Sequence, residues 1–319
     1  MPAHAGRLRP LERCIFTLVF ALMASFVVLV AFMATTTRGH LLLAGPAVAA
    51  ELTVQAPASG SGPAGPVRTH GEHSQPRGQV PTPLVLSAAL AGALRPVVGT
   101  DPGQLAVGVV DLNSGAAAAY DADAPIRGGA IVATDILAAL LLQHQQAGAP
   151  LSDHDAQLAA DMIENDSTTA ANQLWTVIGG APGLATANAT LKLRDTSVAA
   201  GESWTWAKTT VADQLQLLAD IAGPRSPLDS ASRDYALGLM TSVAVQQPWG
   251  VLAAATTGMP GAISDGSLLG PRWVIGSIGV IQRDGHELLI AVLSDRNPAE
   301  GPAVSAARAA VLAAASTVS

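Results

Sequence analysis

The sequence predicts an α+β domain over residues 84–319, in which terminal helices flank an antiparallel sheet and a mainly helical subdomain is inserted. Three observations predict this class. Hairpin-like pairs of strands occur near both ends of the region, a long helical block separates them, and helical segments come first and last. Strands grouped at two ends of a region, with helices between them, are typical of α+β domains and not of regularly alternating α/β folds.

The individual elements follow from hydrophobic periodicity and turn signals. Strands are expected in two hairpins, whose turns contain Asn113-Ser114-Gly115 and Arg283-Asp284-Gly285-His286. These strands are expected over residues 104–111, 116–120, 273–282 and 287–294. Helices are expected over residues 84–94, 131–146, 153–164, 169–178, 210–221, 230–246 and 303–317.

The N-terminal part predicts export. Residues 1–14 are basic, and the uncharged residues 15–34 are long enough to cross a bilayer as a helix with the N-terminus in the cytoplasm. We expect this segment to be an uncleaved transmembrane anchor. A long signal peptide is the alternative, because Ala47-Val48-Ala49 resembles a cleavage site. Residues 35–83 are rich in Pro, Gly and Ser and predict a flexible extracytoplasmic linker. The region from residue 84 is therefore expected outside the cytoplasm.

Charge limits the partners of this region. After residue 84 the chain has 21 of its 24 acidic residues but only 11 of its 17 Lys and Arg residues, which leaves ten net negative charges. Because phosphate binding needs clustered cations, nucleic acid is excluded as a partner.

Cys14 is the one cysteine of the chain, so an intramolecular disulfide is impossible. No cofactor or metal is expected, because the histidine pairs His70 with His73 and His144 with His154 are not part of a larger set of ligands.

Three segments resemble the motif-bearing segments of the penicillin-recognising serine hydrolases, the superfamily of the class A β-lactamases and D,D-peptidases. Residues 129–137 resemble the start of the buried helix that carries S-x-x-K in the family. Residues 162–172, MIENDSTTAAN, match M-I-x-x-S-D-N-x-A-A-N at Met, Ile, Ala, Ala and Asn. Ser264-Asp265-Gly266 stands in the place of K-T-G, just before the strand expected over residues 273–282. The resemblance covers about residues 104–315 and implies a β-lactamase-like fold.

The same resemblance implies that the reacting groups are lost. Ala130 and Ala133 occupy the positions of the nucleophilic serine and its lysine base, and neither side chain can attack a substrate or accept a proton. No serine precedes a lysine by three residues anywhere in the chain, and the nearest approximation, Thr205 with Lys208, lies outside the expected helix start. The family's deacylating glutamate would lie between residues 193 and 210, where Glu202 is interpreted as a surface residue.

The substrate-binding positions implied by the resemblance are also changed. Asp166 and Thr168 replace the proton-relaying serine and the amide-binding asparagine, and Ser264 replaces the lysine that pairs with the substrate carboxylate. Gly266 is retained, as expected for a close backbone approach on an inner strand. A carboxylate at Asp166 would repel the carboxylate of penicillins and of peptide stems.

Other catalytic and binding motifs carry less weight. The near match to G-x-S-x-G around Ser277 falls within an expected strand, so Ser277 is interpreted as a sheet residue. Trp204 and Trp206 lie in a loop beside the expected cleft, where they are interpreted as packing residues, with a pocket for a sugar or peptide as the alternative.

The sequence thus predicts an exported β-lactamase-like pseudoenzyme with a binding or structural role at the cell envelope. Its expected partner is a peptidoglycan-related ligand or an envelope protein. The alternative is an active serine hydrolase with relocated groups, in which Ser167 or Ser264 is the nucleophile and Asp166 or Asp265 the base. A purely structural domain without a ligand pocket is the third possibility.

Overall fold

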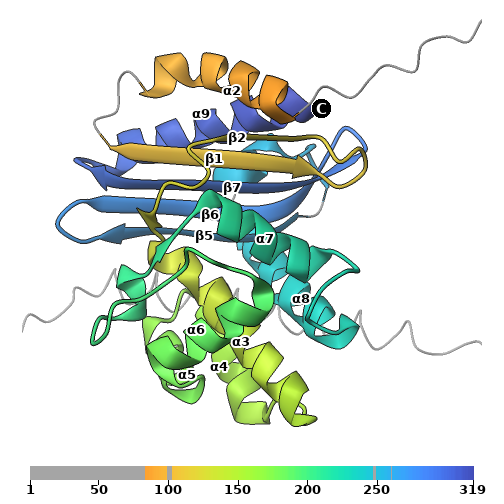
Figure 1. Ribbon diagram of the computed structural model, residues 1–319, viewed down its shortest axis with the longest axis vertical. Helices are drawn as coiled ribbons and strands as arrows, with labels where there is room; N and C mark the ends of the chain where they lie inside the picture. The colour runs from red at the N-terminus through yellow and green to blue at the C-terminus, as the bar shows by residue number, and fades with distance from the viewer. Residues whose placement is uncertain (1–82, 99–102, 247–248, 260) are drawn as a thin grey trace, which may run out of the picture. The chain divides into compact units, whose positions relative to one another are not determined.

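The computed structural model describes residues 83–98, 103–246, 249–259 and 261–319, shown in colour in Figure 1. Every helix and strand labelled in Figure 1 lies within these ranges. The expectations for residues 1–82, including the anchor or signal peptide, the linker, Cys14, His70 and His73, lie outside the described residues.

A five-stranded antiparallel sheet lies at the centre of the described part of the chain, in the order β2-β1-β7-β6-β5. Its strands are β1 (Gln104–Asp111), β2 (Ala117–Tyr120), β5 (Gly261–Leu269), β6 (Trp273–Arg283) and β7 (His286–Asn297). The middle strands are apolar on both faces, since β7 is buried without interruption from Leu288 to Leu293. A sheet buried in this way needs helices on both sides. Two short strands, β3 (Ile126–Arg127) and β4 (Lys208–Thr209), pair separately.

Helices cover both faces of the sheet (Figure 1). The terminal helices α2 (Pro83–Val98) and α9 (Glu300–Val318) pack against each other, and α9 covers β1, β6 and β7. α7 (Val211–Ala222) packs on β1, β6 and β7 as well and begins at Thr210, whose side chain caps it by accepting from the Asp213 N–H at 3.1 Å. The expected arrangement of terminal helices around an antiparallel sheet is confirmed.

The inserted subdomain consists of helices. They are α3 (Val132–Ala147), α4 (Asp153–Glu164), α5 (Thr168–Val177), α6 (Gly180–Leu191) and α8 (Ser230–Gln246). α3 is buried on all sides from Val132 to Leu142, which makes it the central helix of the subdomain. Three short 3-10 helices, η1 (Gly129–Ile131), η2 (Trp204–Trp206) and η3 (Gly250–Ala254), connect the subdomain and the sheet.

The helix α6 and the strands β3, β4 and β5 were not among the expected elements. α6 was not predicted, because Gly180, Pro182 and Gly183 suggest a loop. It forms because Leu184, Ala187 and Leu191 bury one face and Gly183 allows close packing, since a Cβ there would lie 1.6 Å from the Ile178 carbonyl oxygen. β5 was also not predicted over its full length, and it is an edge strand of the described sheet, so the expected inner strand around Gly266 was wrong.

α9 is the only helix among the described residues that is long and apolar enough to cross a membrane. Its buried residues are small and lie on one face, at Ala303, Ala307, Ala310, Val311 and Ala314. This face packs against the sheet, as expected for a core helix of a folded domain.

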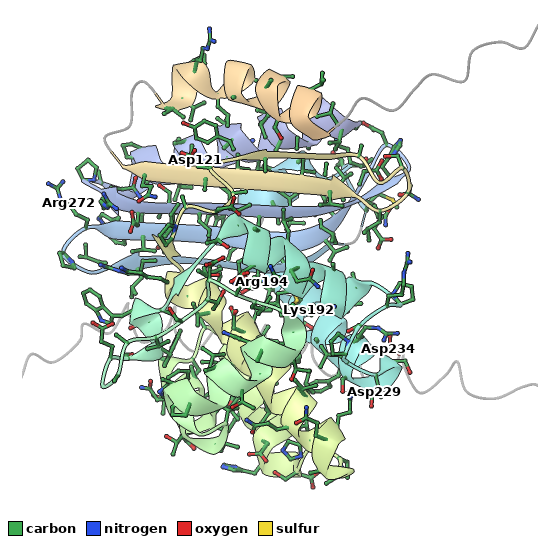
Figure 2. The ribbon with its side chains drawn as sticks, in the orientation of Figure 1. Asp121, Lys192, Arg194, Asp229, Asp234 and Arg272 are labelled. Carbon is green, nitrogen blue, oxygen red and sulfur yellow. The ribbon has the colours of Figure 1, made fainter. Side chains whose placement is uncertain are left out.

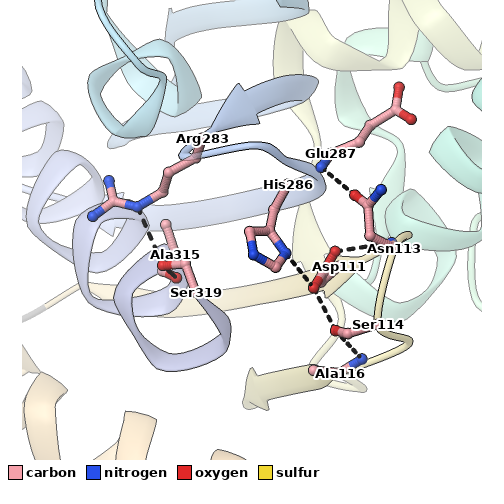
Figure 3. A network of polar contacts seen from close by, with 9 residues as sticks. All are labelled: Asp111, Asn113, Ser114, Ala116, Arg283, His286, Glu287, Ala315 and Ser319. Carbon is pink, nitrogen blue, oxygen red and sulfur yellow. Dashed lines mark hydrogen bonds and ion pairs between the residues drawn. The ribbon is translucent and has the colours of Figure 1, made fainter.

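A buried carboxylate joins the two hairpins at one end of the sheet (Figure 3). Asp111 is fully buried and accepts hydrogen bonds from the Asn113 N–H at 2.9 Å, from the Ser114 hydroxyl and from the His286 ring at 2.9 Å. Burial raises the pKa of Asp111, but the bonds from Ser114, Asn113 and His286 outweigh it and hold this pKa below its ordinary value. The ionised form therefore stabilises the fold, and this contribution is lost as the pH falls below about 4.

We expect Asp111→Asn to lower the free energy of unfolding by about 2 kcal/mol at pH 7, because hydrogen bonds to a charged acceptor are replaced by weaker ones. Urea unfolding measures the change. Asp284→Asn, at an exposed position of the neighbouring turn, is the control and should change stability little. Equal stability of the two variants would contradict this role of Asp111.

Candidate functional site

A cleft of about 410 Å³ lies where the helical subdomain meets the end of β5 and the start of α9. Its described lining comes from six segments that are far apart in the sequence. The lining residues are Ala130, Ala133, Met162, Asp166, Ser167, Thr168, Ala171, Trp204, Thr205, Trp249, Gly266, Ser267, Leu268, Glu300 and Val304. All three motif-like segments identified in the sequence therefore contribute to one cleft.

Two alanines stand where the first motif reaches the cleft. Ala130 lies in η1 and Ala133 in the first turn of α3, and both line the cleft. Gly266 of β5 faces them, since a Cβ added at Gly266 would lie 2.3 Å from the Ala130 Cβ. Only glycine fits this approach without displacing η1. The helix start and the strand thus meet at the cleft, where the two helix positions offer only methyl groups.

The turn between α4 and α5 forms the second wall. Asp166 is exposed and has the left-handed backbone conformation, with φ 50°, and Ser167 caps α5 by accepting from the Ala170 N–H at 3.2 Å. Thr168 begins α5. Further along the helix, Asn172 accepts a hydrogen bond from the indole N–H of Trp204 at 2.8 Å. The second motif therefore places a carboxylate at the cleft and fixes the orientation of Trp204.

A second carboxylate lies behind the β5 wall. Asp265 is buried and accepts a hydrogen bond from the hydroxyl of Ser277 on β6, which itself accepts from the Val251 N–H at 2.8 Å. Burial raises the pKa of Asp265 well above its ordinary value, the bond from Ser277 lowers it, and the charge of Asp166 raises it further. Ser264, which the sequence resemblance places at the position of a carboxylate-binding lysine, is also buried.

Several other sequence candidates lie away from the cleft lining. Lys208 is exposed in β4 and Glu202 is exposed in the preceding loop. His144 lies 3.7 Å from Asp155, and no group of three or more metal-ligating residues occurs among the described residues. Trp206 is 40% exposed and stacks under Arg127, with the guanidinium carbon 4.1 Å from the ring centroid. Of the tryptophan pair, only Trp204 lines the cleft.

Sequence reasoning missed two members of the lining. Trp249 precedes η3, and Glu300 begins α9 and accepts a hydrogen bond from the Ser267 hydroxyl. Neither residue lies in a motif, and both reach the cleft through the packing of the C-terminal elements on β5. The scarcity of aromatic residues, 3% of the chain, was the only signal for Trp249.

Comparisons with known proteins identify the fold. No protein-family model and no curated protein matches the sequence. Solved structures do match: PBP-A has a TM-score of 0.63 at 18% identity, over 72% of this chain and 96% of that chain. The fold is that of the class A β-lactamases and PBP-A. A class A β-lactamase from Bacteroides cellulosilyticus (TM-score 0.62, 12% identity) covers 73% of this chain and 98% of its own. A β-lactamase from Xanthomonas campestris pv. campestris has a TM-score of 0.62 at 18% identity. The match covers 73% of this chain and 99% of that one.

The cleft lining offers few groups for hydrolytic chemistry. Among its described lining residues there is no lysine, arginine or histidine, so the hydroxyl groups at the cleft have only carboxylates as possible bases within that lining. Ser167 uses its oxygen to cap a helix. The positive charges Arg127 and Lys208 belong to the neighbouring β3–β4 pair and not to the lining.

Proposed function

We propose that this β-lactamase-like domain is a non-catalytic binding domain of the cell envelope. The observation that carries the proposal is a formed cleft whose two central helix positions are Ala130 and Ala133. Loss of the nucleophile alone costs about a millionfold in rate in serine hydrolases. The volume of the cleft, about 410 Å³, is large enough for a ligand and argues against a purely structural role.

The location at the envelope is inferred from the sequence. A basic N-terminus followed by the uncharged residues 15–34 is typical of an exported chain with a single N-terminal anchor. A domain held outside the membrane would meet wall material and other envelope proteins. A peptidoglycan-related ligand is therefore the first candidate for the cleft, and an envelope protein is the second.

Labelling and thermal shift together test this proposal. The full-length protein in detergent is incubated with a fluorescent penicillin or a fluorescent fluorophosphonate and separated by denaturing electrophoresis. Unlabelled wall peptides are then added in a thermal-shift experiment. We expect no covalent band with either probe and a rise in melting temperature with wall peptides. A fluorophosphonate band that Ser167→Ala or Ser264→Ala removes would establish the relocated hydrolase instead.

A further inference from the structure

A cationic patch lies beside the cleft, at the β3–β4 pair and the turn between β5 and β6. We call it the Arg127 patch, and its members are Arg127, Trp206, Lys208, Leu269 and Arg272. The segments that carry it, residues 126–128, 204–209 and 269–273, contain these three cations and no acidic residue. The patch is therefore a local exception in a region with ten net negative charges.

Arg127 joins the parts of the patch. It is paired directly with Lys208 in the antiparallel β3–β4 register, so the two side chains extend from the same face of this ribbon. Its guanidinium carbon lies 4.1 Å from the centroid of the Trp206 ring. A Cβ added at Gly270 would lie 3.2 Å from a terminal nitrogen of Arg127, which places the β5–β6 turn against the same side chain. Segments from distant parts of the sequence thus form one surface.

The patch combines exposed apolar side chains with cations that form no ion pair. Leu269 is 62% exposed and Trp206 is 40% exposed. Lys208 and Arg272 are exposed as well, and Figure 2 shows Arg272 at one end of the sheet. Within the described ranges, no carboxylate pairs with Arg127, Lys208 or Arg272. Isolated exposed apolar residues are ordinary, but an indole and a leucine beside three such cations indicate a contact surface.

This set of side chains matches the surface of an anionic bilayer. Tryptophan is enriched at membrane–water interfaces, where its ring lies at the level of the headgroups. Apolar side chains beside basic ones are typical of segments that lie in this interface. Each Lys or Arg near an anionic lipid surface raises the affinity about fivefold. Carboxylates of the domain that lie more than about 8 Å from the bilayer are screened at physiological salt, so they do not cancel this attraction.

We propose that the Arg127 patch docks the domain onto an anionic phospholipid bilayer, with Trp206 and Leu269 at the level of the headgroups and the three cations on lipid phosphates. This inference rests on the proposed location at the cell envelope. The expected anchor makes a weak contact sufficient, because a random-coil linker of the length of residues 35–83 would keep the domain within roughly 40 Å of the bilayer.

Docking would also orient the cleft. Thr205 and Leu268 line the cleft and directly precede Trp206 and Leu269 in the chain. A bilayer contact at the Arg127 patch therefore places the cleft next to the membrane surface. The cleft is then positioned for ligands held close to the membrane and not for ligands farther out in the envelope.

Fluorescence of the full-length protein in vesicles tests the inference. Cys14→Ser removes the one cysteine of the chain, and Leu269→Cys or Asp234→Cys then carries an environment-sensitive nitrobenzoxadiazole label. Asp234 is exposed on α8 and is the control site (Figure 2). The vesicles are phosphatidylcholine with or without about one third phosphatidylglycerol, and brominated lipids quench a label that contacts them.

We expect the label at residue 269 to be quenched at least about threefold more than the label at residue 234 in anionic vesicles, because only the first would lie in the interface. The difference should disappear in pure phosphatidylcholine and at about 0.5 M salt, which screens the cations. Equal quenching at the two sites in anionic vesicles would overturn the inference.

Single neutralising variants assign the contact to the patch. Arg127→Gln, Lys208→Gln and Arg272→Gln, each in the protein labelled at residue 269, should lower the ratio of docked to undocked protein about fivefold. Arg225→Gln, at an exposed position between α7 and α8, removes the same charge elsewhere and should leave this ratio unchanged. A thermal melt of each variant shows that it is folded. Folded patch variants that dock like the Arg225 variant would contradict the proposal.

The two proposals can fail separately. A protein that stays in solution when detergent is removed in the presence of vesicles would contradict the envelope anchor and overturn docking with it. Binding of a polyglutamate peptide that Arg127→Gln weakens, with no quenching at residue 269, would assign the patch to an acidic protein and overturn the bilayer contact. Neither result changes the thermal shift with wall peptides, which tests the binding function of the cleft.

Discussion

The double variant Ala130→Ser/Ala133→Lys is expected to form an acyl adduct with penicillin G slowly, and adding Asp166→Ser should speed its formation tenfold to a hundredfold. The two positions line one cleft, so the new serine and lysine can share it. The carboxylate of Asp166 would still repel that of the penicillin. At a separation of about 6 Å this repulsion is roughly 1–3 kcal/mol, depending on solvent screening.

Intact-mass spectrometry over time measures adduct formation. The matched control adds Asp234→Ser to the double variant, which removes a carboxylate from an exposed site on α8. This control should form the adduct no faster than the double variant. If the Asp166 and Asp234 variants react at the same rate, the charge of Asp166 does not hinder penicillin binding.

Asp135→Asn is expected to stabilise the fold by up to about 4 kcal/mol at pH 8 and much less at pH 5. Asp135 is 1% exposed within α3, where its carboxylate accepts from the Gln214 side chain at 3.2 Å. Burial is the main reason that the pKa of Asp135 is raised to about 7. The hydrogen bond from Gln214 lowers this pKa, and the nearby charge of Asp213 raises it. Because the folded protein holds this proton more tightly than the unfolded chain, the free energy of unfolding falls as the pH rises from about 4 to about 7.

Urea unfolding of both proteins between pH 5 and pH 8 measures this effect. The variant keeps a neutral side chain at all these pH values, so the stability difference between the two proteins should grow with pH. Asp234→Asn, at an exposed site, should follow the wild-type curve. Parallel curves for Asp135→Asn and wild type would show that Asp135 titrates at its ordinary pKa.

Much of the fold follows from local sequence signals. The hairpin turn at Asp284 and Gly285 has positive φ at both residues, as its Asp-Gly pair predicts. The Ser152 side chain caps α4 by accepting from the Asp155 N–H, a local contact that serine commonly makes at this position. Apart from α6, the helices of the helical block were predicted from their hydrophobic periodicity. β5 was not, because its strand character comes from pairing with β6 along its whole length and not from an alternating pattern.

The cleft was less predictable than the fold. The motif-like segments indicated where Ala130, Asp166 and Gly266 would lie, because each follows a local pattern. Glu300 and Trp249 come from elements that reach the cleft only through tertiary packing, so no local pattern places them there. The contact between Asp265 and Ser277 depends on the pairing of β5 with β6, which no local sequence pattern shows.

Intact-mass spectrometry of the wild-type protein after long exposure to penicillin G and to a fluorophosphonate is the most direct test of a non-catalytic cleft. A non-catalytic domain keeps its mass unchanged with both reagents, because Ala130 offers no nucleophile and the hydroxyls of the described lining have no basic nitrogen beside them within it. A mass increase equal to one penicillin or one phosphonyl group, mapped to a serine or threonine of the cleft, would contradict the account and establish a serine hydrolase.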